Sequence, residues 1–198
     1  MMMIRWKAIA SIPACFFLPI VHAQDTIESF LQACTDDAVD TVRTALQEHP
    51  DWLHIRSSHG ETCLHVAGIY GASAVTRAVL QAGADPNVRS TYEHGLRMHP
   101  LSWNVYGGHV TNVRLLLEHG ADPNLDVDPM VKGASPETVL DIVQRILGAF
   151  DENYKDNENQ NEDSRYTAFR EIEKLLVKYD AKSFDALNTV DDSSHAEL

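Results

Sequence analysis

The most informative part of this sequence is Gly60-Glu61-Thr62-Cys63-Leu64-His65-Val66-Ala67, which Gly83-Ala84-Asp85-Pro86-Asn87 completes after an apolar run. A second copy opens with His99-Pro100-Leu101-Ser102-Trp103 and closes with Gly120-Ala121-Asp122-Pro123-Asn124. Three pairs of landmarks share one spacing of 37 residues, namely Leu64 and Leu101, Gly71 and Gly108, and Gly83 and Gly120. A shared spacing of this kind indicates an internal repeat.

Each part of the repeat has a local structural role. Thr62 is placed to cap a first helix by accepting a backbone N–H, and Pro100 suits a first helical turn. Gly71 and Gly108 end that helix, where a left-handed residue is needed. The following Val/Leu run forms the buried face of a second helix, and Ala-Asp-Pro-Asn then turns the chain. The repeat therefore predicts an inner helix, an antiparallel outer helix and a finger-like loop.

This pattern resembles the ankyrin family, whose repeat opens with Thr-Pro-Leu-His, continues through Gly-His and ends in Gly-Ala-Asp-x-Asn. Two weaker copies flank the clear ones. Residues 26–34 and 38–49 would form the helices of an N-terminal capping repeat, and residues 171–181 match the end of a last outer helix. The resemblance implies an all-α ankyrin-repeat solenoid over residues 25–182. Its four repeats are expected near 25–56, 57–89, 90–125 and 126–182.

The first 23 residues read as a separate segment. Arg5 and Lys7 precede an apolar stretch, and Val21-His22-Ala23 resembles a signal cleavage site. We expect a cleaved secretion signal over residues 1–23 and a periplasmic mature protein. An uncleaved N-terminal anchor stays open as an alternative. A lipoprotein signal ending at Cys15 fits less well, because apolar sequence continues past that cysteine.

The chain is strongly acidic. It holds 16 Lys and Arg against 29 Asp and Glu, which gives a formal net charge of −13. This balance argues against a nucleic-acid partner, since nothing offsets phosphate repulsion. It favours a basic protein partner, because opposite charges speed encounter and select the right partner. We expect no membrane contact after signal cleavage, and a monomer when the partner is absent.

Two cysteines, Cys34 and Cys63, remain after the predicted signal. The repeat alignment places Cys34 late in one inner helix and Cys63 at the start of the next. That offset of about five residues corresponds to roughly 7 Å along a helix, to which the spacing between helices is added. A disulfide needs Cα atoms within about 7 Å of each other. The offset therefore favours two free, mostly buried thiols, and the alternative left open is a disulfide, which an exported protein can form.

The finger loops after the two clear repeats are longer than the ~33-residue ankyrin repeat requires, by about four and about six residues. The resemblance implies that the fingers and the inner-helix face line a concave binding surface. Aromatic, Met and Arg side chains, which interface cores favour, gather in the first long finger. Trp103 is expected in the core. The predicted partner-binding residues are Ser58, His59, Glu61, Ile69, Tyr70, Tyr92, Glu93, His94, Leu96, Arg97, Met98, Tyr106, Asp126, Asp128, Met130 and Arg145.

The sequence contains no motif that carries a known chemistry. It has no His-x-x-x-His pair on one helix face, no Cys-x-x-Cys, no Gly-x-Ser-x-Gly and no phosphate or dinucleotide loop. His65 matches the structural histidine of the ankyrin repeat, and Cys63 beside it is expected to be buried and inert. We therefore predict no metal site, no cofactor and no enzymatic activity.

Two segments depart from the repeat near its C-terminal end. Residues 151–165 are acidic and rich in Asn, which predicts a flexible or loosely helical insertion between the helices of the last repeat. Whether this insertion touches a partner is left open. Residues 188–198 are expected to form a disordered tail.

The resemblance also narrows the function. Bacterial exported ankyrin proteins of this size resemble periplasmic immunity proteins, which neutralise a toxin delivered by a type VI secretion system. The expected function is therefore an exported protein-binding module that neutralises or docks a protein partner without catalysis. In its most specific form it is an immunity protein that inhibits a basic, cell-envelope-degrading toxin or enzyme. The alternative is a periplasmic ankyrin protein of oxidative-stress defence associated with catalase. The sequence features that favour this alternative are accessible Met98 and Met130 and the two thiols.

Overall fold

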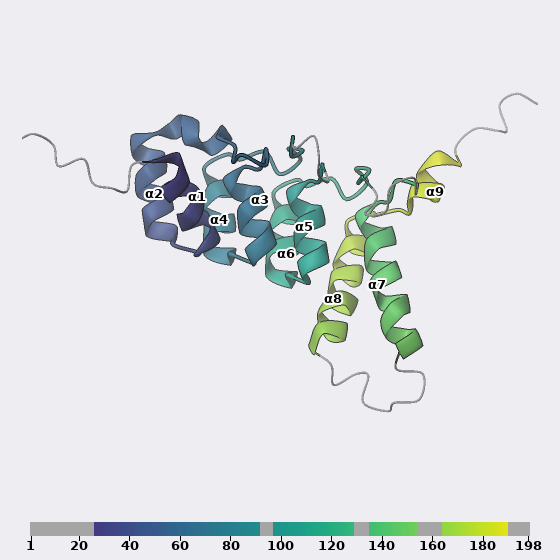
Figure 1. Cartoon of the computed structure of the whole chain (residues 1–198). Helices are drawn as coiled ribbons and strands as arrows, with labels where there is room; N and C mark the ends of the chain where they lie inside the picture. Colours follow the sequence, from purple (N-terminus) through teal and green to yellow (C-terminus); the bar gives the residue numbers. More distant parts are fainter. Residues whose placement is uncertain (1–25, 92–96, 129–134, 154–163, 190–198) are drawn as a thin grey trace, which may run out of the picture.

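The computed structural model describes residues 26–91, 97–128, 135–153 and 164–189. Figure 1 shows stacked antiparallel helix pairs, with the last pair inclined to the others. Over the described ranges no strand is present, apart from an isolated bridge between Val127 and Glu137. The predicted all-α solenoid is confirmed. Its helices are α1 (Ile27–Thr35), α2 (Val39–Glu48), the 3-10 helix η1 (Pro50–His54), α3 (Cys63–Tyr70), α4 (Ser73–Gln81), α5 (Pro100–Gly107), α6 (Val110–Glu118), α7 (Val139–Asn153), α8 (Ser164–Lys178) and α9 (Phe184–Asn188).

The inner helices α1 and α3 begin at threonines that satisfy free backbone N–H groups. Thr26 Oγ1 accepts a hydrogen bond from Ser29 N (3.2 Å), and Ser29 Oγ accepts one from Thr26 N (3.2 Å). Thr62 pairs in the same way with His65, whose Nδ1 accepts from Thr62 N (3.1 Å). These are reciprocal capping boxes. The predicted capping role of Thr62 is confirmed.

The turn after each inner helix needs a left-handed residue. Gly71 and Gly108 supply it with φ of 72° and 70°, but the first repeat uses Asp37 with φ of 55°. A non-glycine residue in this region is strained. Asp37 offsets that cost, because its carboxylate accepts hydrogen bonds from Val75 N (2.8 Å) and Ala74 N (3.3 Å) at the start of α4. Its side chain therefore ties the first repeat to the second.

The asparagine that closes each clear repeat joins neighbouring turns. Asn87 donates to the carbonyl O of Gly120 (3.1 Å) and accepts from Asp122 N (2.8 Å). Asn124 makes the same two bonds one repeat later, with Asp180 O (3.1 Å) and Lys182 N (2.8 Å). Asp180 therefore stands where Gly120 stands, and its φ of 61° keeps the left-handed turn.

One position of the outer helices breaks the apolar pattern of the core. Val75, Asn112 and Ile172 occupy equivalent positions in α4, α6 and α8, and each is 0% exposed. Neither polar side-chain atom of Asn112 has a hydrogen-bond partner among the described residues. A buried amide without partners is destabilising. The third repeat therefore contains a weak point that the second and fourth do not share.

Asn112→Val is expected to raise the free energy of unfolding by about 1–2 kcal/mol, because it removes the buried amide and restores the residue found in α4. Urea denaturation followed by circular dichroism measures the change. The matched control, Val75→Asn, introduces the same amide into the second repeat and should destabilise it by about 2 kcal/mol or more. A destabilised Asn112→Val variant would show that the amide is hydrogen-bonded in solution.

The prediction of two free thiols is wrong, because Cys34 and Cys63 form a disulfide with their Cα atoms 5.6 Å apart. Both are buried, as expected. The prediction placed neighbouring inner helices side by side at equal height. In the structure, a late position of one inner helix lies against the first turn of the next. The following junction shows this too: a Cβ added at Gly68 would lie 3.3 Å from Pro100 O. The five-residue offset therefore brings the cysteines together.

Several predictions concern residues outside the described ranges. The signal segment 1–23 lies entirely outside them, as do residues 154–163 of the acidic insertion and 190–198 of the tail. The described ends of the insertion are helical, since α7 runs to Asn153 and α8 begins at Ser164. Asn188, the first residue of the predicted tail, closes α9 and donates to Phe184 O (2.7 Å). Among the described helices, none is long and apolar enough to span a bilayer.

Candidate functional site

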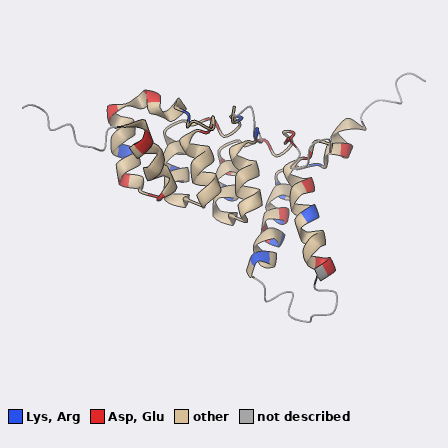
Figure 2. Ribbon diagram, in the orientation of Figure 1, with Lys and Arg blue, Asp and Glu red and all other residues tan. Residues whose placement is uncertain are grey.

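The inner helices of the two central repeats present a surface without charges. Neither α3 nor α5 contains Asp, Glu, Lys or Arg, and both ribbons are tan in Figure 2. Tyr70 ends α3 with 62% of its surface exposed, and Tyr106 is half-buried in the last turn of α5. Two tyrosines near equivalent ends of neighbouring helices supply large contact area at low entropic cost.

Arg145 of α7 extends this surface to the last repeat. Its guanidinium donates to both carboxylate oxygens of Glu137 (2.9 and 3.0 Å) and to Tyr106 Oη (3.1 Å). The bonds to Glu137 raise the pKa of Arg145 despite its partial burial. Burial raises the pKa of Tyr106, so its hydroxyl stays protonated. We call Ile69, Tyr70, Tyr106, Glu137 and Arg145 the inner-helix face; its one guanidinium is fixed before any partner arrives.

An ion-pair network joins the two long fingers. Arg89 contacts Asp126 (2.9 Å) and Asp128 (3.5 Å), and Arg97 contacts Asp128 (3.0 Å). Slight burial would raise the pKa of Asp128, but the hydrogen bonds from Arg97 lower it. Asp126 and Arg97 remain exposed. Three predicted contact residues, Arg97, Asp126 and Asp128, therefore form ion pairs that join the two fingers.

Met98 is not on a projecting loop, contrary to the prediction. It is 0% exposed, and its backbone carbonyl O lies 3.1 Å from His65 Nε2. Its amide also donates to Ser90 Oγ (3.1 Å). The chain returns to the core one residue before the helix cap at His99, so the Met98 side chain fills the stack. Met98→Ala would therefore test the packing of the core and would not test binding of a partner.

The remaining predicted contact residues divide into two groups. Ser58 and His59 are exposed beside half-buried Glu61, whose pKa is raised by burial although the nearby His59 opposes that rise. The other group lies outside the described residues and comprises Tyr92, Glu93, His94, Leu96 and Met130. Trp103, expected in the core, packs against it while remaining partly exposed.

The sequence had no signal for the bond between Arg145 and Tyr106. The two residues are 39 positions apart, on different inner helices, and Glu137 precedes α7. The repeat register identified Tyr106 and Arg145 as outward-facing. Their contact depends on the pairing of α5 with α7, which only the tertiary structure specifies.

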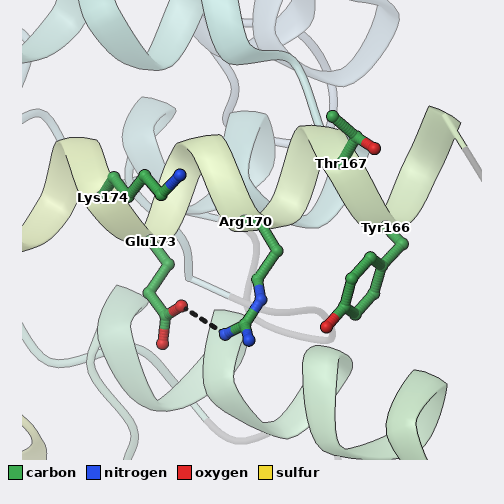
Figure 3. Close-up of a pocket in the computed structure, with 5 residues that line it drawn as sticks. All are labelled: Tyr166, Thr167, Arg170, Glu173 and Lys174. Carbon is green, nitrogen blue, oxygen red and sulfur yellow. Dashed lines mark hydrogen bonds and ion pairs between the residues drawn. The ribbon is translucent and has the colours of Figure 1, made fainter. Parts of the chain in front are cut away.

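A hollow of about 620 Å³ lies along α8, lined by Tyr166, Thr167, Arg170, Glu173 and Lys174. Figure 3 shows Arg170 and Glu173 on the same side of the helix as Tyr166. Arg170 pairs with Glu173 (3.0 Å) and lies over the Tyr166 ring (5.5 Å). Glu173 occupies the position of buried Val113 and Thr76 in the preceding outer helices. This side of α8 therefore carries a polar side chain at a position that is buried in α4 and α6.

The described residues contain no cluster of metal-binding side chains. No group of three His, Cys, Asp or Glu among them could hold a metal ion. Cys63 is tied to Cys34, so the thiol expected beside His65 does not exist. His65 instead bridges Thr62 N and Met98 O, and burial lowers its pKa to about 4.

The stacked helix pairs and their preformed inner face define a helical-repeat protein. Residues 59–91 and 97–127 match the family model of the ankyrin repeat. A similar protein is an ankyrin repeat protein of Acanthamoeba polyphaga mimivirus, 27% identical over 100 residues. The match covers 50% of this chain and 12% of that relative's length. The chain is an all-α ankyrin-repeat solenoid. Ankyrin repeats generally act as modules that bind other proteins, which points to a protein partner for the matched repeats.

Proposed function

We propose that this chain is an exported inhibitor that binds one protein partner through the inner-helix face. In its most specific form, the proposal is a periplasmic immunity protein that neutralises a basic toxin or enzyme attacking the cell envelope. The observation that carries it is the exposed Tyr70 at the end of α3, together with a Tyr106–Arg145–Glu137 cluster that is already ordered. Tyrosine and arginine are the residues that most often dominate interface energies.

The charge distribution supports a basic partner. Residues 25–56 hold seven acidic residues against two basic ones, and Figure 2 shows acidic residues on α1, α2 and η1. Helix α3, which carries Ile69 and Tyr70 of the inner-helix face and no charged residue, lies next to this acidic repeat. A basic partner would be attracted by the whole molecule and would then bind the aromatic side chains at close range.

The Cys34–Cys63 disulfide supports export. Disulfides persist in oxidising compartments such as the periplasm and are rare where glutathione keeps thiols reduced. The N-terminal segment with secretion-signal character points in the same direction. The oxidative-stress alternative loses two of its supports, since Met98 is buried and both thiols are oxidised.

Tyr70→Ala and Arg145→Ala are each expected to weaken the complex with the partner about tenfold or more, because each removes a central contact group. The partner would be captured from the envelope fraction with tagged protein, identified by mass spectrometry, and titrated by calorimetry. Gln81→Ala, on the exposed side of α4, is the matched control and should leave affinity unchanged. If all three variants bind equally well, the inner-helix face is not the contact surface.

The immunity role has its own test. Cells that lack the gene should be killed by sibling cells that deliver the toxin, and purified protein should inhibit the captured hydrolase at a one-to-one ratio. Full resistance of the deletion strain, together with failure to capture any toxin, would falsify the immunity role. It would leave the protein-binding function intact.

A further inference from the structure

The outer helices carry one cation at the same position in every repeat. The backbone bonds Val42 N–Ala38 O, Thr76 N–Ala72 O and Val113 N–His109 O align α2, α4 and α6. The bonds Ala121 N–Leu116 O and Ala181 N–Leu176 O align α6 with α8. In this register, the residue after Val42, Thr76, Val113 and Glu173 is always basic. We call these residues the outer cation row: Arg43, Arg77, Arg114 and Lys174.

All four members of the outer cation row are exposed. Arg114 pairs with Glu171 (2.7 Å), whereas Arg43, Arg77 and Lys174 form no ion pair with any residue in the described part of the chain. Arg77 is the only charged residue of α4. A protein with a net charge of −13 therefore has a line of mostly unpaired cations on the surface opposite the inner-helix face.

The spacing of the row is set by helix packing. The outer helices α2, α4, α6 and α8 lie side by side in that order. Packed helices are about 8–10 Å apart. An extended peptide in the polyproline II conformation has three residues per turn and advances about 3.1 Å per residue, so every third side chain lies on the same side, about 9 Å further along. Acidic side chains at every third position of an extended chain would therefore meet successive cations of the row.

We propose that the outer cation row is a second docking surface, which binds an extended acidic peptide segment of a partner protein with Asp or Glu at every third residue. The last member, Lys174, lines the hollow on α8, and Figure 3 shows it on the same side of the helix as Thr167. The hollow leaves room for the end of the segment. Long double-stranded nucleic acid fits less well, because a duplex that extends past the row onto the acidic first repeat would have its phosphates repelled there.

Local attraction can act although the whole protein is negative. At physiological ionic strength, charges farther apart than about 8 Å are largely screened from one another. A peptide lying along the row is then governed by the cations beneath it. Because the contacts are exposed ion pairs, binding should be weak and should depend strongly on salt.

The test uses a fluorescein-labelled peptide of about 13 residues with Glu at every third position and Gly-Ser between, followed by fluorescence anisotropy against the full chain. We expect saturable binding at about 50 mM salt, weakened about tenfold or more at about 300 mM. Arg43→Glu, Arg77→Glu and Lys174→Glu should each weaken binding about three- to tenfold, and the triple variant should abolish it. Circular dichroism checks that these exposed substitutions leave the fold intact.

Two controls distinguish binding along the outer cation row from a general attraction between opposite charges. Lys182→Glu changes the net charge equally, but it lies after α8 and outside the row, so it should leave binding unchanged. A peptide of the same composition with consecutive Glu residues should bind more weakly. Equal binding of both peptides, or of a 20-base-pair DNA duplex, would mean nonspecific attraction of anions and would overturn the proposal. Tyr70→Ala should leave peptide binding unchanged, so failure here is distinguishable from failure of the inner-helix face.

Discussion

Loss of the Cys34–Cys63 disulfide is expected to lower the free energy of unfolding by about 3.5 kcal/mol. The bridge closes a loop with a sequence separation of 29, and the chain-entropy relation gives this magnitude for such a loop. The double variant Cys34→Ala/Cys63→Ala removes the bridge without leaving a buried thiol. Urea denaturation of this variant and of the oxidised protein, followed by circular dichroism, measures the difference.

The loss should be concentrated at one end of the molecule. The disulfide joins α1 to α3, so the first repeat depends on it, whereas α7 and α8 do not touch it. Because repeats contact only their neighbours, we expect faster amide hydrogen exchange in α1 and α2 and little change in α8. Reductant added to the double variant is the control and should have no effect. Equal stability of the oxidised protein and the double variant would contradict the prediction.

The second large effect is the dependence of stability on pH through His65. Burial lowers the pKa of His65 to about 4, whereas an unfolded histidine titrates near 6.5. Below pH 6.5 the unfolded chain binds a proton that the folded chain excludes. Stability is therefore lost as pH falls from about 6.5 to 4, by about 3 kcal/mol in all, and nothing is lost above pH 6.5.

The structure explains why the imidazole resists protonation. Nδ1 accepts from Thr62 N, so a proton there would break the cap of α3, and Nε2 already donates to Met98 O. Neighbouring Arg56 and His99 also lower the pKa of His65, because a protonated His65 would place a positive charge close to theirs. Burial lowers the pKa of His99 too, so a smaller effect of the same sign is expected from it.

His65→Gln separates the contribution of the His65 hydrogen bonds to stability from the contribution of its protonation. The variant is expected to be less stable at pH 7.5, but its free energy of unfolding should fall less steeply between pH 6.5 and 5.5. Urea titrations at several pH values give both slopes. His54→Gln replaces an exposed histidine and should follow the wild-type profile. Parallel pH profiles for His65→Gln and wild type would show that another group causes the dependence.

The helix pairs could be predicted because their signals are local. Thr62 and Gly71 mark the ends of an inner helix by capping and left-handed geometry, which depend on a few residues in sequence. The position of Asp37 in the left-handed turn of the first repeat was not predicted. The hydrogen bonds that stabilise it come from the start of α4, after α2, η1 and α3 in the chain.

The candidate site was predicted less completely than the fold. The register identified Tyr70, Tyr106 and Arg145 as outward-facing, because a repeat fixes which side of each helix faces its neighbours. Met98 was misplaced, because a loop residue next to a helix start gives no periodic signal of its own. Its burial depends on the return of the finger to the stack, where its backbone meets His65.

For this protein, the 37-residue spacing alone determined the class of fold, since each helix pair must bury its apolar face against the next copy. Tertiary structure alone decided which cysteines meet, which cations align and which finger residues are buried. These outcomes depend on how neighbouring helices are staggered along their axes. The stagger that brings the end of one inner helix against the start of the next joined Cys34 to Cys63, although their offset along the helices had argued against it.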